Sequence, residues 1–132
     1  MINFFLYLYK PTIKMENKII YQKLRKGFED QYVLAQKYYG ILSVLNNLAL
    51  TEREIQLIAY TAVRGNISLA NVREDFCKRY KSSGATIDNI VSRMKKIGIM
   101  TKENGKVKVI ASIALDFEKD VILQINLKHD TN

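Results

Sequence analysis

The sequence predicts a mainly helical α+β fold: a long helix, then three short helices, then a two-stranded hairpin, with one further strand near each end of the chain. Two local signals and one periodic signal predict it. A capping motif at Thr51 indicates a helix start. The dipeptide Asn104-Gly105 lies between two strand-like runs, and it favours a tight hairpin because both turn positions require positive φ. Between these points, apolar residues recur at helical spacing.

The first short helix is expected to begin after Thr51. Thr51 as N-cap and Glu54 at the third helical position form a capping box, and Leu50 and Ile55 occupy the two positions of a hydrophobic staple. Gly65 is a suitable residue to end this helix, since glycine tolerates the left-handed conformation found there.

The second and third short helices are separated by a tight break over residues 81–83. Ser68 is the expected N-cap of the second helix. The third helix is expected over residues 84–97, and Gly98 suits the position just past its end. Its apolar side chains face inward at 3.6-residue spacing, so the outward residues are Ala85, Thr86, Asn89, Ser92, Arg93 and Lys96.

The flanking segments extend this unit. Residues 28–47 have the spacing of a long helix with two adjacent apolar stripes, a width that indicates either deep burial or contact with a partner chain. Gly40 in its middle weakens the helix. Residues 18–25 and 121–128 alternate as half-buried strands do, and pairing them, within one chain or across a dimer, would cover their edges.

The chain therefore divides into four parts: a leader or irregular segment (1–17), a strand and long helix that form a candidate dimerisation element (18–49), the helix-and-hairpin unit (50–110) and a C-terminal strand extension (111–132). The apolar stretch within residues 2–9 is too short to span a bilayer and lacks the basic start and cleavage site of a signal peptide. Met15 is an alternative start to Met1, and the sequence leaves that choice open.

Charge is concentrated in one segment. The chain has a formal net charge of +8, and residues 64–110 carry 11 basic and 4 acidic side chains, whereas residues 111–132 carry 2 and 4. A local basic field favours a polyanionic partner, because neutralising phosphates releases counterions. A solubilising surface is the alternative interpretation.

The composition argues against several classes of function. The chain has one cysteine, Cys77, and one histidine, His129, so it has neither an internal disulfide nor the ligands of a structural zinc site. No glycine-rich phosphate-binding motif or nucleophile–base arrangement is present. We therefore expect no enzyme activity, no cofactor and no metal, a cytoplasmic location, and a buried side chain for Cys77.

The order of elements resembles the winged helix-turn-helix family of DNA-binding proteins. The segments that carry the resemblance are residues 50–55, 68–76 and 83–94 and the wing around Asn104-Gly105. In this family the third helix enters the major groove, and the wing contacts the neighbouring backbone or minor groove. The resemblance covers about sixty residues and indicates no single subfamily.

The resemblance and the outward face together predict a DNA-binding surface. Asn89 and Arg93 are four residues apart on one side of the third helix, where Asn89 suits adenine and Arg93 suits either guanine or a phosphate. The basic residues of the wing suit the DNA backbone. The predicted DNA-binding residues are Ser82, Ser83, Thr86, Asn89, Arg93, Lys96, Lys102, Lys106 and Lys108.

The sequence thus predicts sequence-specific binding of double-stranded DNA by a homodimer, as in a small transcriptional regulator. The alternative is a winged-helix interaction or assembly module, for instance in a phage structural or replication complex, without DNA readout. The concentration of positive charge on residues 64–110 favours the first.

Overall fold

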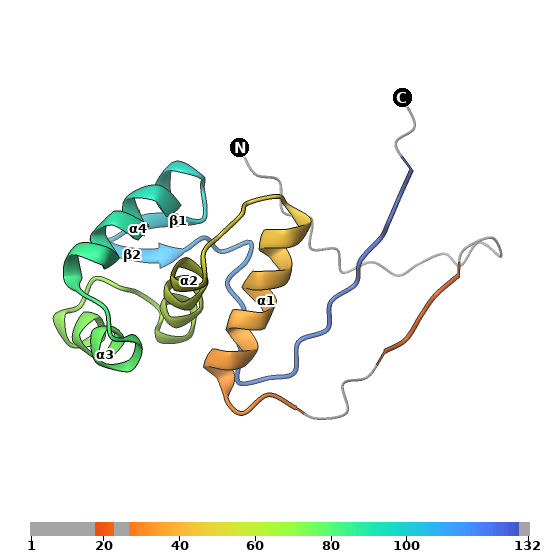
Figure 1. Cartoon of the computed structure of the whole chain (residues 1–132), viewed down its shortest axis with the longest axis horizontal. Coiled ribbons are helices and arrows are strands. Elements are labelled where there is room, and N and C mark those ends of the chain that lie inside the picture. Colours follow the sequence, from red (N-terminus) through yellow and green to blue (C-terminus); the bar gives the residue numbers. More distant parts are fainter. Residues whose placement is uncertain (1–17, 23–26, 130–132) are drawn as a thin grey trace.

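The computed structural model describes residues 18–22 and 27–129 (Figure 1). In chain order its elements are α1 (Gln31–Leu45), α2 (Glu52–Arg64), α3 (Ala70–Tyr80), α4 (Gly84–Lys96), β1 (Met100–Glu103) and β2 (Lys106–Val109). The two strands pair antiparallel. The predicted mainly helical α+β class is confirmed, and the predicted leader, residues 1–17, lies outside the described residues.

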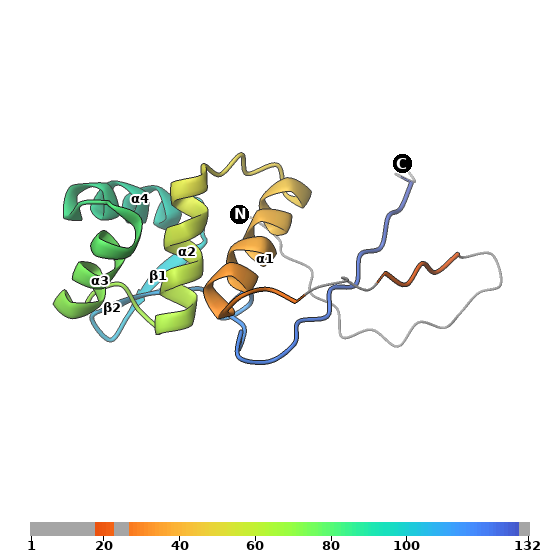
Figure 2. The same cartoon turned by 60° about the horizontal axis from the view of Figure 1, so that its bottom comes forward.

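Helix α2 lies at the centre, with α1 on one side and α3, α4 and the hairpin on the other (Figures 1 and 2). Its predicted capping box is present: Thr51 Oγ1 accepts from the Glu54 amide at 3.2 Å, and the Thr51 amide donates to Glu54 Oε1 at 2.8 Å. Gly65 ends the helix with a φ of 93°. Two local signals therefore fix both ends of the central helix.

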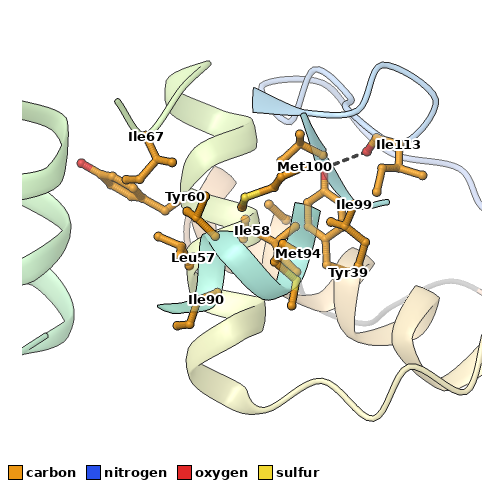
Figure 3. Packing of buried hydrophobic residues seen from close by; sticks show 14 of the residues in the cluster. Tyr39, Leu57, Ile58, Tyr60, Ile67, Ile90, Met94, Ile99, Met100 and Ile113 are labelled. Atoms are coloured by element: carbon orange, nitrogen blue, oxygen red, sulfur yellow. Dashed lines mark hydrogen bonds between the residues drawn. The ribbon is translucent and has the colours of Figure 1, made fainter. Parts of the chain in front are cut away.

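The hydrophobic core is formed by side chains from the elements around α2. Figure 3 shows Leu57 and Ile58 of α2 close to Ile90 and Met94 of α4 and to Met100 of β1. Leu57, Met94 and Ile58 are at most 1% exposed. Burial of this apolar surface is the main force that holds α4 and the hairpin against α2.

The predicted hairpin is confirmed, including its turn. Asn104 and Gly105 have φ values of 51° and 78°, and Glu103 pairs with Lys106 across the turn. The segment between α2 and α3 follows the outer edge of β2: the Ile67 amide donates to the Val107 carbonyl at 3.0 Å. This short contact covers part of an edge that would otherwise be open.

The predicted cap of α3 is wrong. Leu69 occupies the N-cap position and makes no side-chain cap hydrogen bond, while the Ser68 hydroxyl accepts from the Val107 amide of β2 at 2.8 Å. Asn66 Oδ1 accepts instead from the amides of Ser68 and Leu69, at 3.0 and 3.3 Å. Ser68 therefore satisfies the exposed edge of the hairpin rather than the helix.

The two predicted terminal strands are not formed in the described part of the chain. Residues 18–22 and 121–129 are irregular, and residues 23–25 of the first predicted strand lie outside the described residues. The chain after β2 packs instead against α1, where Tyr39 donates its hydroxyl to the Ile113 carbonyl at 2.7 Å (Figure 3) and Phe117 is buried. Burial raises the pKa of the Tyr39 hydroxyl above its ordinary value, so it stays protonated as a donor.

The sequence predicts a buried side chain for Cys77. In the structure this side chain is only half-buried against the core. Among the described residues, no helix is both long and apolar enough to cross a membrane.

Candidate nucleic-acid interface

Helix α4 presents a row of four exposed residues to solvent. Its opposite face packs into the core through Ile87, Ile90, Val91 and Met94. The exposed residues follow one another at intervals of four, three and four, so they line one side of the helix. We call them the α4 ridge: Ala85, Asn89, Ser92 and Lys96. The ridge offers a methyl group, an amide, a hydroxyl and an ammonium group, and no carboxylate.

The start of α4 is held by its own side chains. Ser83 Oγ accepts from the Thr86 amide at 3.2 Å and lies 3.1 Å from the Thr86 hydroxyl, so the two hydroxyls bond to each other. The Ser82 hydroxyl is buried and has no hydrogen-bond partner within the part of the chain that the structure describes. Of these three predicted contact residues, Ser83 thus serves as a helix cap and Ser82 points away from solvent.

Arg93 lies beside the ridge, where it contacts α2. Its guanidinium donates to Oε2 of Glu54, whose side chain is 7% exposed, while the Arg93 side chain is 44% exposed. Burial alone would raise the pKa of the Glu54 carboxyl, but the hydrogen bonds from Arg93 and Thr51 outweigh it and lower that pKa. Arg93 therefore ties α4 to the first turn of α2.

Asp88 is the acidic residue next to Asn89, and its charge is compensated. Arg73 of α3 lies 2.8 Å from Asp88 Oδ1 and also donates to the Gly84 carbonyl at 3.2 Å. These two contacts join α3 to the first turn of α4. Two carboxylates lie on or against α4, and each is paired with an arginine: Asp88 with Arg73, and Glu54 with Arg93.

The three wing lysines do not share a face of the hairpin. Side chains of directly paired residues point to the same side, and pairing of Glu103 with Lys106 and of Thr101 with Lys108 places Lys106 and Lys108 together. Lys102 pairs with Val107 and lies on the other face. Lys102 and Lys106 are exposed, whereas Lys108 is half-buried.

The predicted site residues therefore fall into distinct groups. Asn89 and Lys96 belong to the ridge, while Ser83, Thr86 and Arg93 are engaged in contacts that position α4. Ser92 completes the ridge; helical spacing already placed it outward, but it was not among the predicted contact residues. The Arg93–Glu54 pair had no signal in the sequence because 39 residues separate its members.

Comparison with protein-family models, with curated proteins and with solved structures finds no match to this chain. The described residues contain no group of three or more potential metal-ligating side chains.

Proposed function

We propose that this chain is a winged helix-turn-helix protein that binds double-stranded DNA with sequence specificity, as a homodimer and in the manner of a small transcriptional regulator. The observation that carries the proposal is the α4 ridge. Its amide, hydroxyl and ammonium groups are types that bond to base edges and phosphates, and the helix behind it is anchored to both α2 and α3.

The electrostatics of the ridge support a polyanionic partner. Duplex DNA presents a dense row of phosphates, so an uncompensated carboxylate beside the reading helix would repel it. Glu54 and Asp88 lie against or on α4, and each is paired with an arginine. Lys95 and Lys96 at the end of α4 form no ion pair among the described residues, so their charges face outward.

In this proposal the predicted residues have different tasks. Asn89, in the middle of the ridge, is the base-reading residue, and its amide suits the paired donor and acceptor of adenine in the major groove. Lys96 and the wing residue Lys106 hold phosphates. Arg93 positions α4 through Glu54, in place of the guanine or phosphate contact expected from the sequence.

The first test measures binding of the full chain to random-sequence duplex DNA by fluorescence anisotropy over a series of salt concentrations. A basic surface that displaces counterions predicts a steep linear fall of log K with log salt. Lys128→Ala, at an exposed lysine far from α4, should leave the curve unchanged. If no binding is detected, the chain does not bind DNA, which favours an interaction module. Binding that does not depend on salt would contradict a basic surface that contacts phosphates.

The second test selects bound sequences from a random DNA pool. Asn89→Ala should change the preferred base at one position of each half-site, at a cost of about 1–3 kcal/mol for the original base. Lys106→Ala should weaken all sequences alike, because a phosphate contact carries no sequence information. If the two variants alter the selected sequences in the same way, the α4 ridge is not the reading surface.

A further inference from the structure

An open groove lies along α1 and the first turn of α2, and none of its lining residues belongs to α4. It has a volume of about 700 Å³ and is lined mainly by α1 and the start of α2: Val33, Lys37, Gly40, Val44, Glu52 and Ile55. The Val44 side chain is 76% exposed and that of Leu45, at the same end of the groove, 48%. Val33, Val44 and Leu45 are thus exposed apolar side chains on α1, whereas Tyr38, Tyr39 and Leu42 of the same helix are buried in the core.

Gly40 lies in the groove, and no contact among the described residues requires a glycine there. A Cβ atom placed there would meet nothing within 4 Å, and its φ is not positive. A glycine in the interior of a helix lowers helix stability. It does leave room for the backbone of another helix to approach closely, as small residues do where helices cross.

The groove carries one basic and one acidic side chain, so two copies of it can pair opposite charges. Lys37 and Glu52 are both exposed, and neither forms an ion pair among the described residues. Lys37 precedes Gly40, and Glu52 begins α2 just beyond the C-terminal end of α1. If two copies of α1 cross antiparallel at Gly40, the N-terminal half of one helix faces the C-terminal half of the other, which brings Lys37 of each copy towards Glu52 of the other.

Further exposed apolar side chains gather at the same end of the molecule. Residues 18–22 and 121–129 extend beyond α1 on the side away from α4 (Figures 1 and 2). They include Tyr21, Ile122 and Leu127, whose side chains are 87%, 92% and 88% exposed. An uncovered apolar surface on several neighbouring segments is typical of a protein interface.

We propose that the groove on α1 is the interface between two copies of this chain, related by a two-fold axis near Gly40, with Lys37 of each copy paired with Glu52 of the other. A two-fold axis makes each contact occur twice, so one self-complementary surface suffices. This arrangement leaves both α4 ridges uncovered. The groove would be the interface of the homodimer in the proposed function. The proposal of this interface does not require that the chain binds DNA.

The test exchanges the two charges and measures association by sedimentation velocity in the absence of DNA. Lys37→Glu brings two carboxylates together at each of the two symmetric contacts, and Glu52→Lys brings two ammonium groups together there. Each variant alone should therefore dimerise at least about tenfold more weakly than the parent. An equimolar mixture of the two variants should form a one-to-one heterodimer, because both of its contacts join opposite charges. 

The mixture has a definite expected outcome once its contacts are followed one by one. In the heterodimer, one contact joins the introduced glutamate to the introduced lysine, and the other joins the native Lys37 of one copy to the native Glu52 of its partner. Both contacts are then between opposite charges, so the mixture should associate at the parent affinity. Only a two-fold contact between these two positions predicts that recovery.

A second pair of variants tests the apolar part of the groove. Val44→Asp places a charge in the interface and should weaken dimerisation about a hundredfold, while circular dichroism and thermal unfolding of the dilute protein stay the same, because Val44 is exposed in the single chain. The matched control is Leu69→Asp, at an apolar residue that is 44% exposed and precedes α3. It should leave association unchanged.

A parent chain that is monomeric at all concentrations overturns the proposal, as does a dimer that tolerates Val44→Asp or a mixture of charge variants that forms no heterodimer. These outcomes are independent of the DNA experiments, so either proposal can fail while the other stands.

Discussion

Glu54 stabilises two helices with one buried carboxylate. One oxygen accepts from the amide of Thr51 at the start of α2, and the other accepts from the guanidinium of Arg93 on α4. A buried carboxylate is costly unless all its oxygens are bonded, and here both are. The ionised form of this one side chain therefore adds a polar contact to the apolar packing that orients the α4 ridge relative to α2.

Glu54→Gln tests that dependence through its pH profile. The pKa of Glu54 is lowered in the folded chain, so its contribution to stability is present above the ordinary carboxyl pKa and is lost as the pH falls through the lower, folded pKa. We expect the variant to lose about 1–2 kcal/mol of unfolding free energy at neutral pH, because glutamine retains the Thr51 contact but not the charge. Urea unfolding should show the difference shrinking below about pH 4. Glu74→Gln, at an exposed residue, is the control, and a difference that persists at low pH would contradict this role.

The tip of the hairpin depends on backbone conformation rather than on side-chain contacts. Gly105 has a φ of 78°, and Asn104 before it has a φ of 51°. Gly105→Ala should lower the free energy of unfolding by about 1 kcal/mol, since a Cβ atom disfavours this region. Asn104→Gly should change it by only a few tenths of that amount, since Asn already tolerates positive φ. Equal effects of the two substitutions on thermal unfolding would show that strain at the turn is not the cause.

Helix α1 provides a prediction in which two measurements move in opposite directions. Gly40→Ala should stabilise the dilute single chain by about 0.5–1 kcal/mol, because alanine is the better helix former and its Cβ atom has space. The same methyl group should weaken dimerisation if two helices cross at Gly40. A denaturation series at several protein concentrations separates the two effects. A gain in stability at every concentration would place Gly40 outside any interface.

The elements that the sequence predicts correctly are those with local signals. The capping box of Thr51 and Glu54, the turn at Asn104-Gly105 and the apolar spacing of α4 each lie within a few residues. The terminal strands were wrong because alternation also suits an extended segment without a strand partner, as residues 121–129 are. Periodicity placed Arg93 on the outward side, but its partner Glu54 is set by how α4 packs on α2, which no local pattern encodes.

The excess of positive charge and most of the exposed apolar side chains lie at opposite ends of the described part of the molecule. The basic segment, residues 64–110, forms α3, α4 and the hairpin, whereas most of the exposed apolar residues lie on α1 and beyond it. If the basic end holds DNA and the apolar end holds a second copy, affinity for DNA depends on both surfaces, because joining two binding units makes the second contact intramolecular.

This coupling gives a prediction for the salt dependence of DNA binding. Phosphate contacts by Lys96 and Lys106, the two lysines that hold phosphates in the proposed function, predict a slope of log K against log salt of about −2 for one copy and about −4 for the pair. Lys106→Ala should reduce the slope by about 1 for each copy that binds. Val44→Asp should leave the slope per copy unchanged and lower only the overall affinity, since it separates the copies without touching the basic surface. If Val44→Asp changes the slope per copy, the basic and apolar ends of the molecule are not independent surfaces.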